Sequence, residues 1–275
     1  MKKLLLAAAM CAAFPFAFAA RIVTLTPDVA DVVVELGGAK EIVGREMAST
    51  NPALKNVPSI GLFHGLSVEP IAAKKPTLVL GSWMAQPASI YANLNRVGVK
   101  AINVAPKDDL NGYAAGIRQI GQLIGKNKEA NALADRWLSQ VKQMPKTGKR
   151  YLISYDGRFV SGRNTAADEL IKRAGGVNAA AAIEGMKPMS REAWLAAKPD
   201  IILIADRNQK LVGGVQGLTK RPEIAASPAA KKQKIFFLPS NDLFRYGLNT
   251  PQVIPKLYQL APIIMMQVQQ TAQHT

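Results

Sequence analysis

The sequence predicts an α/β protein with two lobes, each containing a mainly parallel sheet, joined by one long rigid helix. Short apolar strands alternate with helical segments on both sides of residues 110–145, and such alternation is typical of parallel sheets. The middle segment keeps the helical spacing of apolar residues, and one sequence pattern occurs once on each side of it. We therefore divide the chain into residues 1–19, 20–109, 110–145 and 146–275.

Residues 1–19 have the features of a secretory signal peptide. Lys2 and Lys3 precede an apolar run that is too short to form a membrane-spanning helix, and small residues at Ala17 and Ala19 suit a signal peptidase. We expect cleavage after Ala19 and export of a soluble protein.

Cysteine usage limits the chemistry that the exported chain can perform. Cys11 is the only cysteine, and it lies within the predicted signal peptide. The mature chain therefore has no disulfide, no thiolate metal site and no cysteine nucleophile. Its length is sufficient for one large domain or two modest ones with their own cores.

The chain is strongly basic, with a net charge of +16. In an intracellular protein this balance would suggest a nucleic-acid partner, but export and the dispersed positions of the basic residues argue against one. A solvated basic surface, an anionic ligand and a membrane surface all remain compatible with the charge.

The first lobe, residues 20–109, begins with a strand at 22–25 followed by a helix. Thr26 is the expected N-cap, Pro27 is the first helical residue, and Gly37 ends the helix. The rest of the lobe contains further strands and one more helix, which we place at residues 41–44, 77–81 and 100–105 for the strands and 88–98 for the helix.

The middle segment, residues 110–145, has apolar residues at helical spacing from Ile117 to Val141. We interpret it as one long connecting helix. Gly125 is the position at which an interruption is expected.

The second lobe, residues 146–275, repeats the alternation of strand and helix. Thr165 caps a helix that ends at Gly175. We place strands at 150–155, 200–205 and 234–238, a turn or hairpin at 157–162, and a closing helix at 250–268.

The repeated pattern is LSVEPIAAKKPTLVL at 66–80 and MSREAWLAAKPDIIL at 189–203. In each copy a serine caps a short helix and a glutamate, Glu69 or Glu192, occupies its first turn. The helix dipole favours an acid at that position, which is a sufficient structural explanation for each glutamate alone. It does not explain why both lobes carry the same exposed acid.

With these features the chain resembles the periplasmic solute-binding proteins of ABC importers for haem, iron-siderophores and cobalamin. The segments GRNTAADELIKRAGGVNAA (162–180) and EGMKPMSREA (184–193), with the G-x-x-x-x-LS pattern of 61–67, resemble the haem-binding branch. The resemblance implies a periplasmic monomer with a ligand cleft between its lobes. It also implies that Glu69 and Glu192 dock onto arginines of an inner-membrane ABC permease.

The chain departs from this branch at the expected iron ligand. Many haem binders have a tyrosine directly after the glycine of the last pattern, where this chain has Leu62. His64 lies two residues further on, and neutral imidazole is a good ligand for haem iron, although most lone histidines are structural. Met186, from the opposite lobe, and Tyr246 are the other candidate iron ligands.

The resemblance also implies which residues line the cleft. In open α/β sheets, ligands bind beyond the carboxyl ends of the strands, and the propionates of haem require cations or amide donors. The candidate cleft residues are Leu62, Phe63, Trp83, Met84, Arg158, Arg163 and Arg207.

A haem-binding transport protein is therefore our leading interpretation, and the same architecture binding a ferric siderophore or cobalamin is the alternative. An exported hydrolase is disfavoured because the sequence has no G-x-S-x-G motif and only one histidine away from the C-terminus. We expect no enzyme activity and no catalytic cofactor, and the two-lobe repeat disfavours a purely structural protein.

Overall fold

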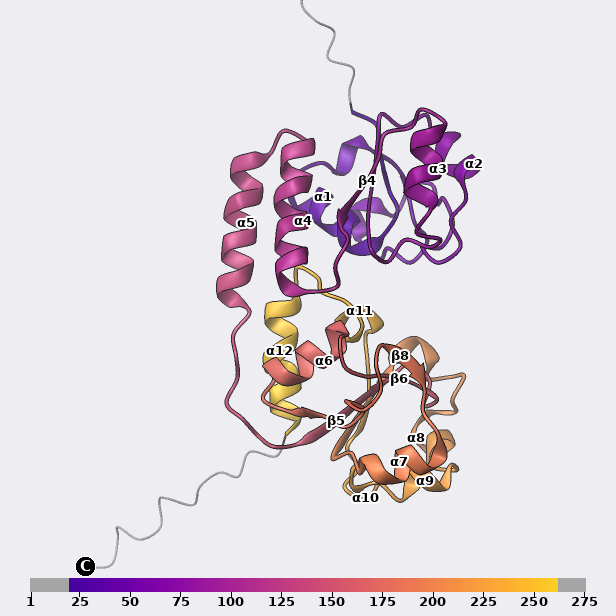
Figure 1. Cartoon of the computed structure of the whole chain (residues 1–275), viewed down its shortest axis with the longest axis vertical. Coiled ribbons are helices and arrows are strands. Elements are labelled where there is room, and N and C mark those ends of the chain that lie inside the picture. Colours follow the sequence, from indigo (N-terminus) through magenta and orange to yellow (C-terminus); the bar gives the residue numbers. More distant parts are fainter. Residues whose placement is uncertain (1–19, 262–275) are drawn as a thin grey trace, which may run out of the picture.

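The structure, a computed structural model, describes residues 20–261 (Figure 1). Two lobes lie one above the other, and a pair of helices runs along one side of the upper lobe. The predicted signal peptide, residues 1–19, lies outside the described residues, as do residues 262–275.

The first lobe contains a four-stranded, wholly parallel sheet in the order β2-β1-β3-β4. All four strands match the predicted ones to within two residues. Their bounds are β1 (Ile22–Thr24), β2 (Ile42–Arg45), β3 (Leu78–Ser82) and β4 (Ala101–Ala105).

The helices of the first lobe follow the predicted boundaries. α1 begins after Thr26 with Pro27 in its first turn, and Gly37 follows the helix at a φ of +84°. The Thr26 hydroxyl does not cap the helix but accepts a hydrogen bond from the backbone N–H of Ser82 at 3.2 Å, tying α1 to β3. The elements are α1 (Pro27–Glu35), α2 (Val68–Ala72), α3 (Ile90–Arg96) and the 3-10 segments η1 (Ala39–Glu41) and η2 (Pro52–Leu54).

The second sheet is mixed, in the order β10-β9-β5-β6-β8, with β7 also paired to β5. β10, β9, β5 and β7 are parallel, whereas β6 and β8 add an antiparallel edge. The strands are β5 (Arg150–Ser154), β6 (Phe159–Ser161), β7 (Val177–Asn178), β8 (Met186–Pro188), β9 (Ile201–Ala205) and β10 (Ile235–Leu238).

Short helices surround the second sheet. The predicted cap of α6 is confirmed, because the Thr165 hydroxyl accepts a hydrogen bond from the backbone N–H of Asp168 at 3.2 Å. The helices are α6 (Ala166–Arg173), α7 (Arg191–Ala197), α8 (Gly214–Leu218), α9 (Pro222–Ala225), α10 (Pro228–Lys231), α11 (Ser240–Leu243), α12 (Thr250–Leu260) and the 3-10 segment η3 (Asp206–Asn208).

The single connecting helix predicted for residues 110–145 is corrected to two antiparallel helices, α4 (Leu110–Leu123) and α5 (Asn127–Gln140) (Figure 1). Gly125 adopts a φ of +72°, a left-handed conformation that ends α4 and reverses the chain. A side chain at Gly121 would collide with Ala130, so the glycine permits the close approach of the two helices. Residues 141–149 then run to β5 without helix or strand.

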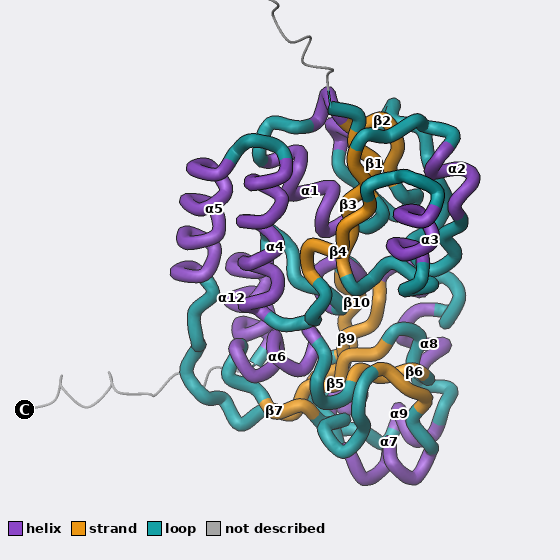
Figure 2. The backbone as a smooth tube through the Cα atoms, turned by 45° about the horizontal axis from the view of Figure 1, so that its top comes forward, coloured by secondary structure: helices purple, strands orange, loops and turns teal. Residues whose placement is uncertain are grey.

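The main hydrophobic core extends through both lobes. It includes Val33 and Leu80 of the first lobe, Ile117 of the connector, and Leu203 and Leu257 of the second lobe. In Figure 2 the strands lie along the middle of the molecule, with helices to either side. Because both lobes bury side chains in one core, packing fixes the position of one lobe relative to the other, and with it the two walls of the cleft.

Candidate functional site

A cavity of about 600 Å³ lies between the two lobes, and we call it the cleft. Its first-lobe wall includes Phe63, His64, Trp83, Met84 and Asp108. The second-lobe wall includes Tyr155, Met186, Arg207, Phe244 and Arg245. Aromatic and thioether side chains on both walls suit a flat apolar ligand, and the arginines provide charge for an anionic one.

The His64 loop is fixed by its neighbours. Gly61 adopts a φ of +105°, which turns the chain into the loop. The carbonyl of Phe63 accepts a hydrogen bond from the N–H of Gln86 at 2.6 Å, and the carbonyl of Gln86 accepts one from Leu66 at 2.9 Å. The Phe63 and His64 rings contact edge to face, with centroids 5.3 Å apart. The exposed imidazole therefore projects from a loop held at both ends.

The second-lobe wall contains a tyrosine that the sequence interpretation missed. Tyr155 directly follows β5, and its ring lies edge to face with Phe244, with centroids 6.0 Å apart. The rule that places ligands beyond the carboxyl ends of strands would have selected it. Met186, at the start of β8, is 44% exposed and lines the same cavity.

Two arginines line the cleft in different ways. Arg207 is exposed, and its Nε donates to the hydroxyl of Ser240 at 2.8 Å. Arg245, which the sequence interpretation did not select, is only 6% exposed and pairs with Asp31 of the first lobe. The helix before Arg245, α11, is too short to show a periodic pattern, so the sequence did not indicate the direction of the Arg245 side chain.

Four of the predicted site residues do not line the cleft. Leu62 lies on the His64 loop, and Arg163 pairs with Glu184 at 3.0 Å. Arg158 lines a separate cavity of about 340 Å³ in the second lobe. Tyr246 packs into the main core instead, because the chain turns inward after Arg245.

The position of Tyr246 disfavours it as an iron ligand. The residue is 4% exposed. Burial, followed by the charges of Asp108 and Glu169, raises the pKa of Tyr246 well above its ordinary value. A phenolate is the form that binds iron, so this environment opposes ligation.

Two carboxyl groups with raised pKa values, the buried Glu46 and the half-buried Asp108, lie near the junction of the lobes. Burial raises the pKa of Glu46 to about 7, and its Oε2 accepts a hydrogen bond from the N–H of Ala48 at 2.6 Å. Burial likewise raises the pKa of Asp108 to about 7. Each group has one carboxylate oxygen that is buried without a hydrogen-bond partner.

The two repeated glutamates occupy matching places. Glu69 and Glu192 are exposed in the first turns of α2 and α7, one in each lobe. The repeat extends to the backbone, since Lys75 and Lys198 both adopt left-handed conformations, with φ of +49° and +42°. Only Ser190 caps its helix through the side chain, accepting from Ala193 at 3.2 Å.

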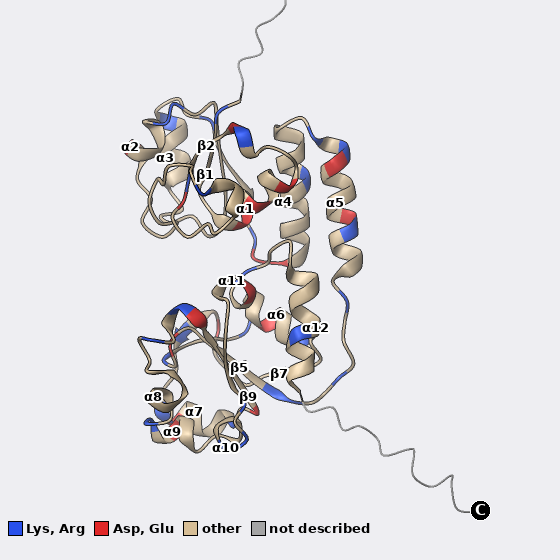
Figure 3. Cartoon of the chain, turned by 180° about the vertical axis from the view of Figure 1, so that it is seen from behind, with Lys and Arg blue, Asp and Glu red and all other residues tan. Residues whose placement is uncertain are grey.

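Basic side chains are spread over both lobes and α5 (Figure 3). Within residues 20–261, no group of three or more His, Cys, Asp or Glu side chains is arranged to hold a metal ion. The same residues include no helix that is both long and apolar enough to cross a membrane.

Comparison with solved structures gives close matches over nearly the whole chain. The periplasmic haem-binding protein RhuT from Roseiflexus sp. RS-1, in its apo form, is 33% identical and superposes with a TM-score of 0.81. The match covers 89% of this chain and 100% of RhuT. The haem-binding protein BhuT, in complex with two haems, is 28% identical with a TM-score of 0.81, over 88% of this chain and 97% of BhuT.

Curated relatives include binders of other cargo. The vitamin B12-binding protein of Salmonella typhi is 26% identical, over 69% of this chain and 73% of that protein. The family described as Periplasmic binding protein matches residues 22–241, which include the first-lobe wall of the cleft and most of the second-lobe wall. The chain is therefore a member of the periplasmic binding protein family.

Proposed function

We propose that the chain binds haem in the cleft and delivers it to an ABC permease. The observation that carries this proposal is the cavity of about 600 Å³ whose walls, one from each lobe, present aromatic and thioether side chains around an exposed histidine. The size suits a porphyrin, since ligand cavities of several hundred Å³ hold molecules of this class. Similarity to RhuT and BhuT supports the same cargo.

His64 is the proposed first-lobe ligand of the haem iron. Its loop is held by the hydrogen bonds of Phe63 and Leu66. Ligation of the iron by the imidazole therefore costs little conformational entropy of the loop. Across the cleft, Tyr155 and Met186 offer a phenol and a thioether as the sixth ligand.

Arg207 is the proposed partner of a haem propionate. Ser240 holds its Nε, which orients the guanidinium at the cleft wall. The terminal N–H groups of an arginine oriented in this way can bind a carboxylate in bidentate fashion.

The second candidate cargo is cobalamin or a ferric siderophore. Leu62 stands where many haem binders have a tyrosine, and a vitamin B12-binding protein is among the relatives. Such a ligand would use the same cleft without an axial histidine. Binding titrations of one protein sample with hemin, cyanocobalamin and a ferric siderophore distinguish the three candidate cargoes.

Delivery requires contact with a membrane partner. We assign this contact to Glu69 and Glu192, because an exposed acid at the same place on each lobe can meet a pair of basic sites on a permease. The protein then acts as a monomeric carrier without a reaction of its own, in the periplasm and after removal of residues 1–19.

Absorption titration of the mature protein with hemin tests the proposal. We expect a saturable change in the Soret band, and His64→Ala to alter its position and weaken binding. His274→Ala, which removes the other histidine of the chain, is the matched control and should leave the band unchanged. Absence of a saturable change in the unmodified protein would reject haem as the cargo.

A further inference from the structure

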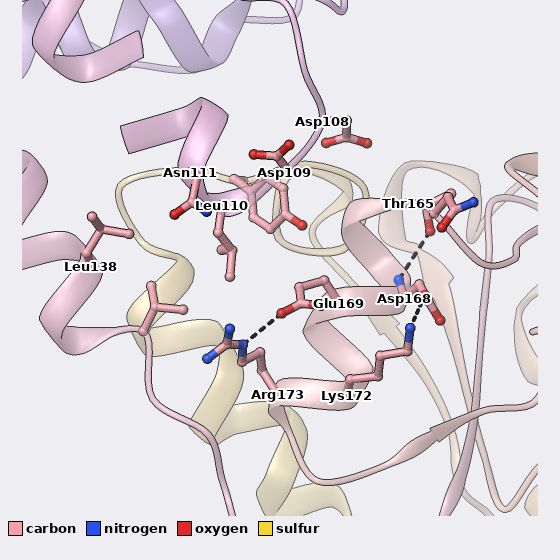
Figure 4. A pocket seen from close by; sticks show the side chains of 13 residues that line it. Asp108, Asp109, Leu110, Asn111, Leu138, Thr165, Asp168, Glu169, Lys172 and Arg173 are labelled. Atoms are coloured by element: carbon pink, nitrogen blue, oxygen red, sulfur yellow. Dashed lines mark hydrogen bonds and ion pairs between the residues drawn. The ribbon is translucent and has the colours of Figure 1, made fainter. Parts of the chain in front are cut away.

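Asp108 lies at the boundary between two cavities. It follows β4 and immediately precedes the N-cap of α4, at the junction of the first lobe and the connector. On one side it lines the cleft. On the other it lines a cavity of about 480 Å³ between the connector and α6, which we call the connector cavity (Figure 4). Asn164 and Thr165 of the second lobe line both cavities as well.

The carboxyl group of Asp108 is incompletely satisfied. Its Oδ1 is buried without a hydrogen-bond partner. The backbone N–H of Ala166, the first residue of α6, stabilises the ionised form. In Figure 4 Asp168 and Glu169 are joined to Lys172 and Arg173, whereas Asp108 stands apart from both pairs. Asp108, which lines the cleft, therefore keeps one carboxylate oxygen without a hydrogen bond.

The charged groups around Asp108 do not favour its ionised form. Asp28 of α1 and Asp109, the N-cap of α4, both repel a second negative charge. In the connector cavity, the two acids of α6 are already neutralised by Lys172 and Arg173, at 2.6 and 2.7 Å. The remaining titratable or charged groups that share a cavity with Asp108 are Tyr246 in the connector cavity and His64, Tyr155, Arg207 and Arg245 in the cleft.

Arg245 offers Asp108 little compensation, because its guanidinium already interacts with Asp31 and Asn241. Desolvation is the largest cause of the raised pKa of Asp108, and repulsion by Asp28 and Asp109 adds to it. Because its pKa is raised to about 7, the neutral acid is accessible near neutral pH. A carboxylic acid can donate a hydrogen bond, which a carboxylate cannot.

We propose that Asp108 recognises a carboxylate of the cargo as the neutral acid, with its O–H donating to the carboxylate oxygen. Where Asp108 is ionised in the free protein, one proton passes from solvent to its carboxylate as the cargo binds; where it is already neutral, no proton is transferred. This inference rests on the proposed function, since haem carries two propionates. It makes Asp108 a residue that selects carboxylate-bearing cargo.

The proposal fixes the sign of the pH dependence. An anionic cargo next to Asp108 raises the proton affinity of the group further, so cargo and proton bind cooperatively. Affinity is then high at about pH 6 and falls by about tenfold towards pH 9 for each unit by which cargo raises the pKa.

Hemin titrations at about pH 6, 7.5 and 9 test the inference on the mature protein. We expect the affinity of the unmodified protein to fall about tenfold across this range and that of Asp108→Asn to stay constant within about twofold. Asp109→Asn is the matched control, because asparagine is also a good N-cap; it removes only the smallest of the causes that raise the pKa of Asp108, so a pH dependence of the same sign should remain. A pH dependence that persists in Asp108→Asn overturns the assignment.

Two further measurements do not depend on the variant folding. Calorimetry of hemin binding to the unmodified protein, in two buffers of different ionisation enthalpy, should show net proton uptake near pH 7.5, and no uptake overturns the proposal. Iron protoporphyrin dimethyl ester, which lacks the carboxylates, should bind without this uptake. If hemin binds with an affinity that is independent of pH, this inference alone fails, whereas absence of hemin binding at every pH rejects the proposed function with it.

Discussion

The guanidinium Nη2 of Arg245, in the second lobe, lies 3.4 Å from Oδ2 of Asp31, in the first. Among residues 20–261 this is the one ion pair that joins the two lobes. The arginine side chain is 7% exposed and the aspartate 30%, so the pair is only partly shielded from water. Arg245→Leu should lower the free energy of unfolding by about 1–3 kcal/mol, measured by urea denaturation.

A double-mutant cycle with Asp31→Asn isolates the contribution of the pair itself. We expect a coupling energy of about 1 kcal/mol, and recovery of part of the stability in Arg245→Lys. A coupling energy near zero would show that the two side chains act independently.

The sixth ligand of the iron should come from Tyr155. Its ring is half-buried and packs against Phe244 directly after β5, whereas Met186 is 44% exposed. A phenolate also suits ferric iron better than a thioether does. Tyr155→Phe should therefore change the visible spectrum of the ferric complex, and Met186→Leu should not. The reverse pattern would assign the ligand to Met186.

Stability should decrease as pH rises towards neutrality. Burial raises the pKa of Glu46 from 4.5 to about 7, so the folded protein holds a proton that the unfolded chain releases between these values. The free energy of unfolding therefore falls with rising pH across that window, and Asp108 adds a change of the same sign.

Glu46→Gln removes the titrating group while keeping an oxygen acceptor for the N–H of Ala48. The variant should be more stable than the unmodified protein by about 2–3 kcal/mol at about pH 8 and no more stable at about pH 4. Chemical denaturation at both pH values checks this. Glu35→Gln changes an exposed carboxyl of α1 and serves as the control. Equal stabilisation at both pH values would contradict the assignment.

The indole of Trp137 should contribute to holding the connector against the second lobe. Its Nε1 donates to the carbonyl of Gly247 at 2.9 Å, and the ring packs against Tyr113 with centroids 4.8 Å apart. Trp137→Phe should cost about 1–3 kcal/mol through the lost hydrogen bond and packing. Trp194→Phe is a useful comparison, because the equally buried Nε1 of Trp194 has no partner to lose. A larger cost at Trp194 than at Trp137 would argue against the role of the hydrogen bond.

Glu69 and Glu192 should affect delivery without affecting cargo binding. Neither residue lines the cleft, and both are exposed. Charge reversal, as Glu69→Lys with Glu192→Lys, should reduce stimulation of the permease ATPase in proteoliposomes by about tenfold or more and leave the hemin affinity unchanged. Glu184→Lys, which reverses an exposed acid outside the repeat, is the control. Full stimulation by the double variant would remove these residues from the docking surface.

The strands and the larger helices of each lobe could be predicted because their signals are local. Apolar runs such as 201–205, and caps such as Thr165, specify an element from neighbouring residues alone. The connector was predicted as one helix because α4 and α5 have similar periodicity. The left-handed Gly125 and the contact of Gly121 with Ala130 depend on tertiary packing.

The candidate site was predictable where backbone position alone decides which side chains meet. His64, Trp83 and Met84 lie in loops and Met186 begins β8, and the structure brings the four to one cavity. The sequence did not indicate the direction of two side chains: Tyr246 packs into the core, and Arg158 lines another cavity. Asp108 was missed because its surroundings include Asn164 and Thr165 of the second lobe, which are distant in sequence.

The reversal of the connector at Gly125 has a topological consequence. Since α5 runs back along the outer side of α4, residues 141–149 carry the chain into the second lobe, and this stretch includes exposed lysines at 142 and 146. Trypsin should nick the folded protein here, yet the shared core should keep the two fragments together as one particle. The protein could therefore be produced as two separately expressed polypeptides that assemble into a working carrier.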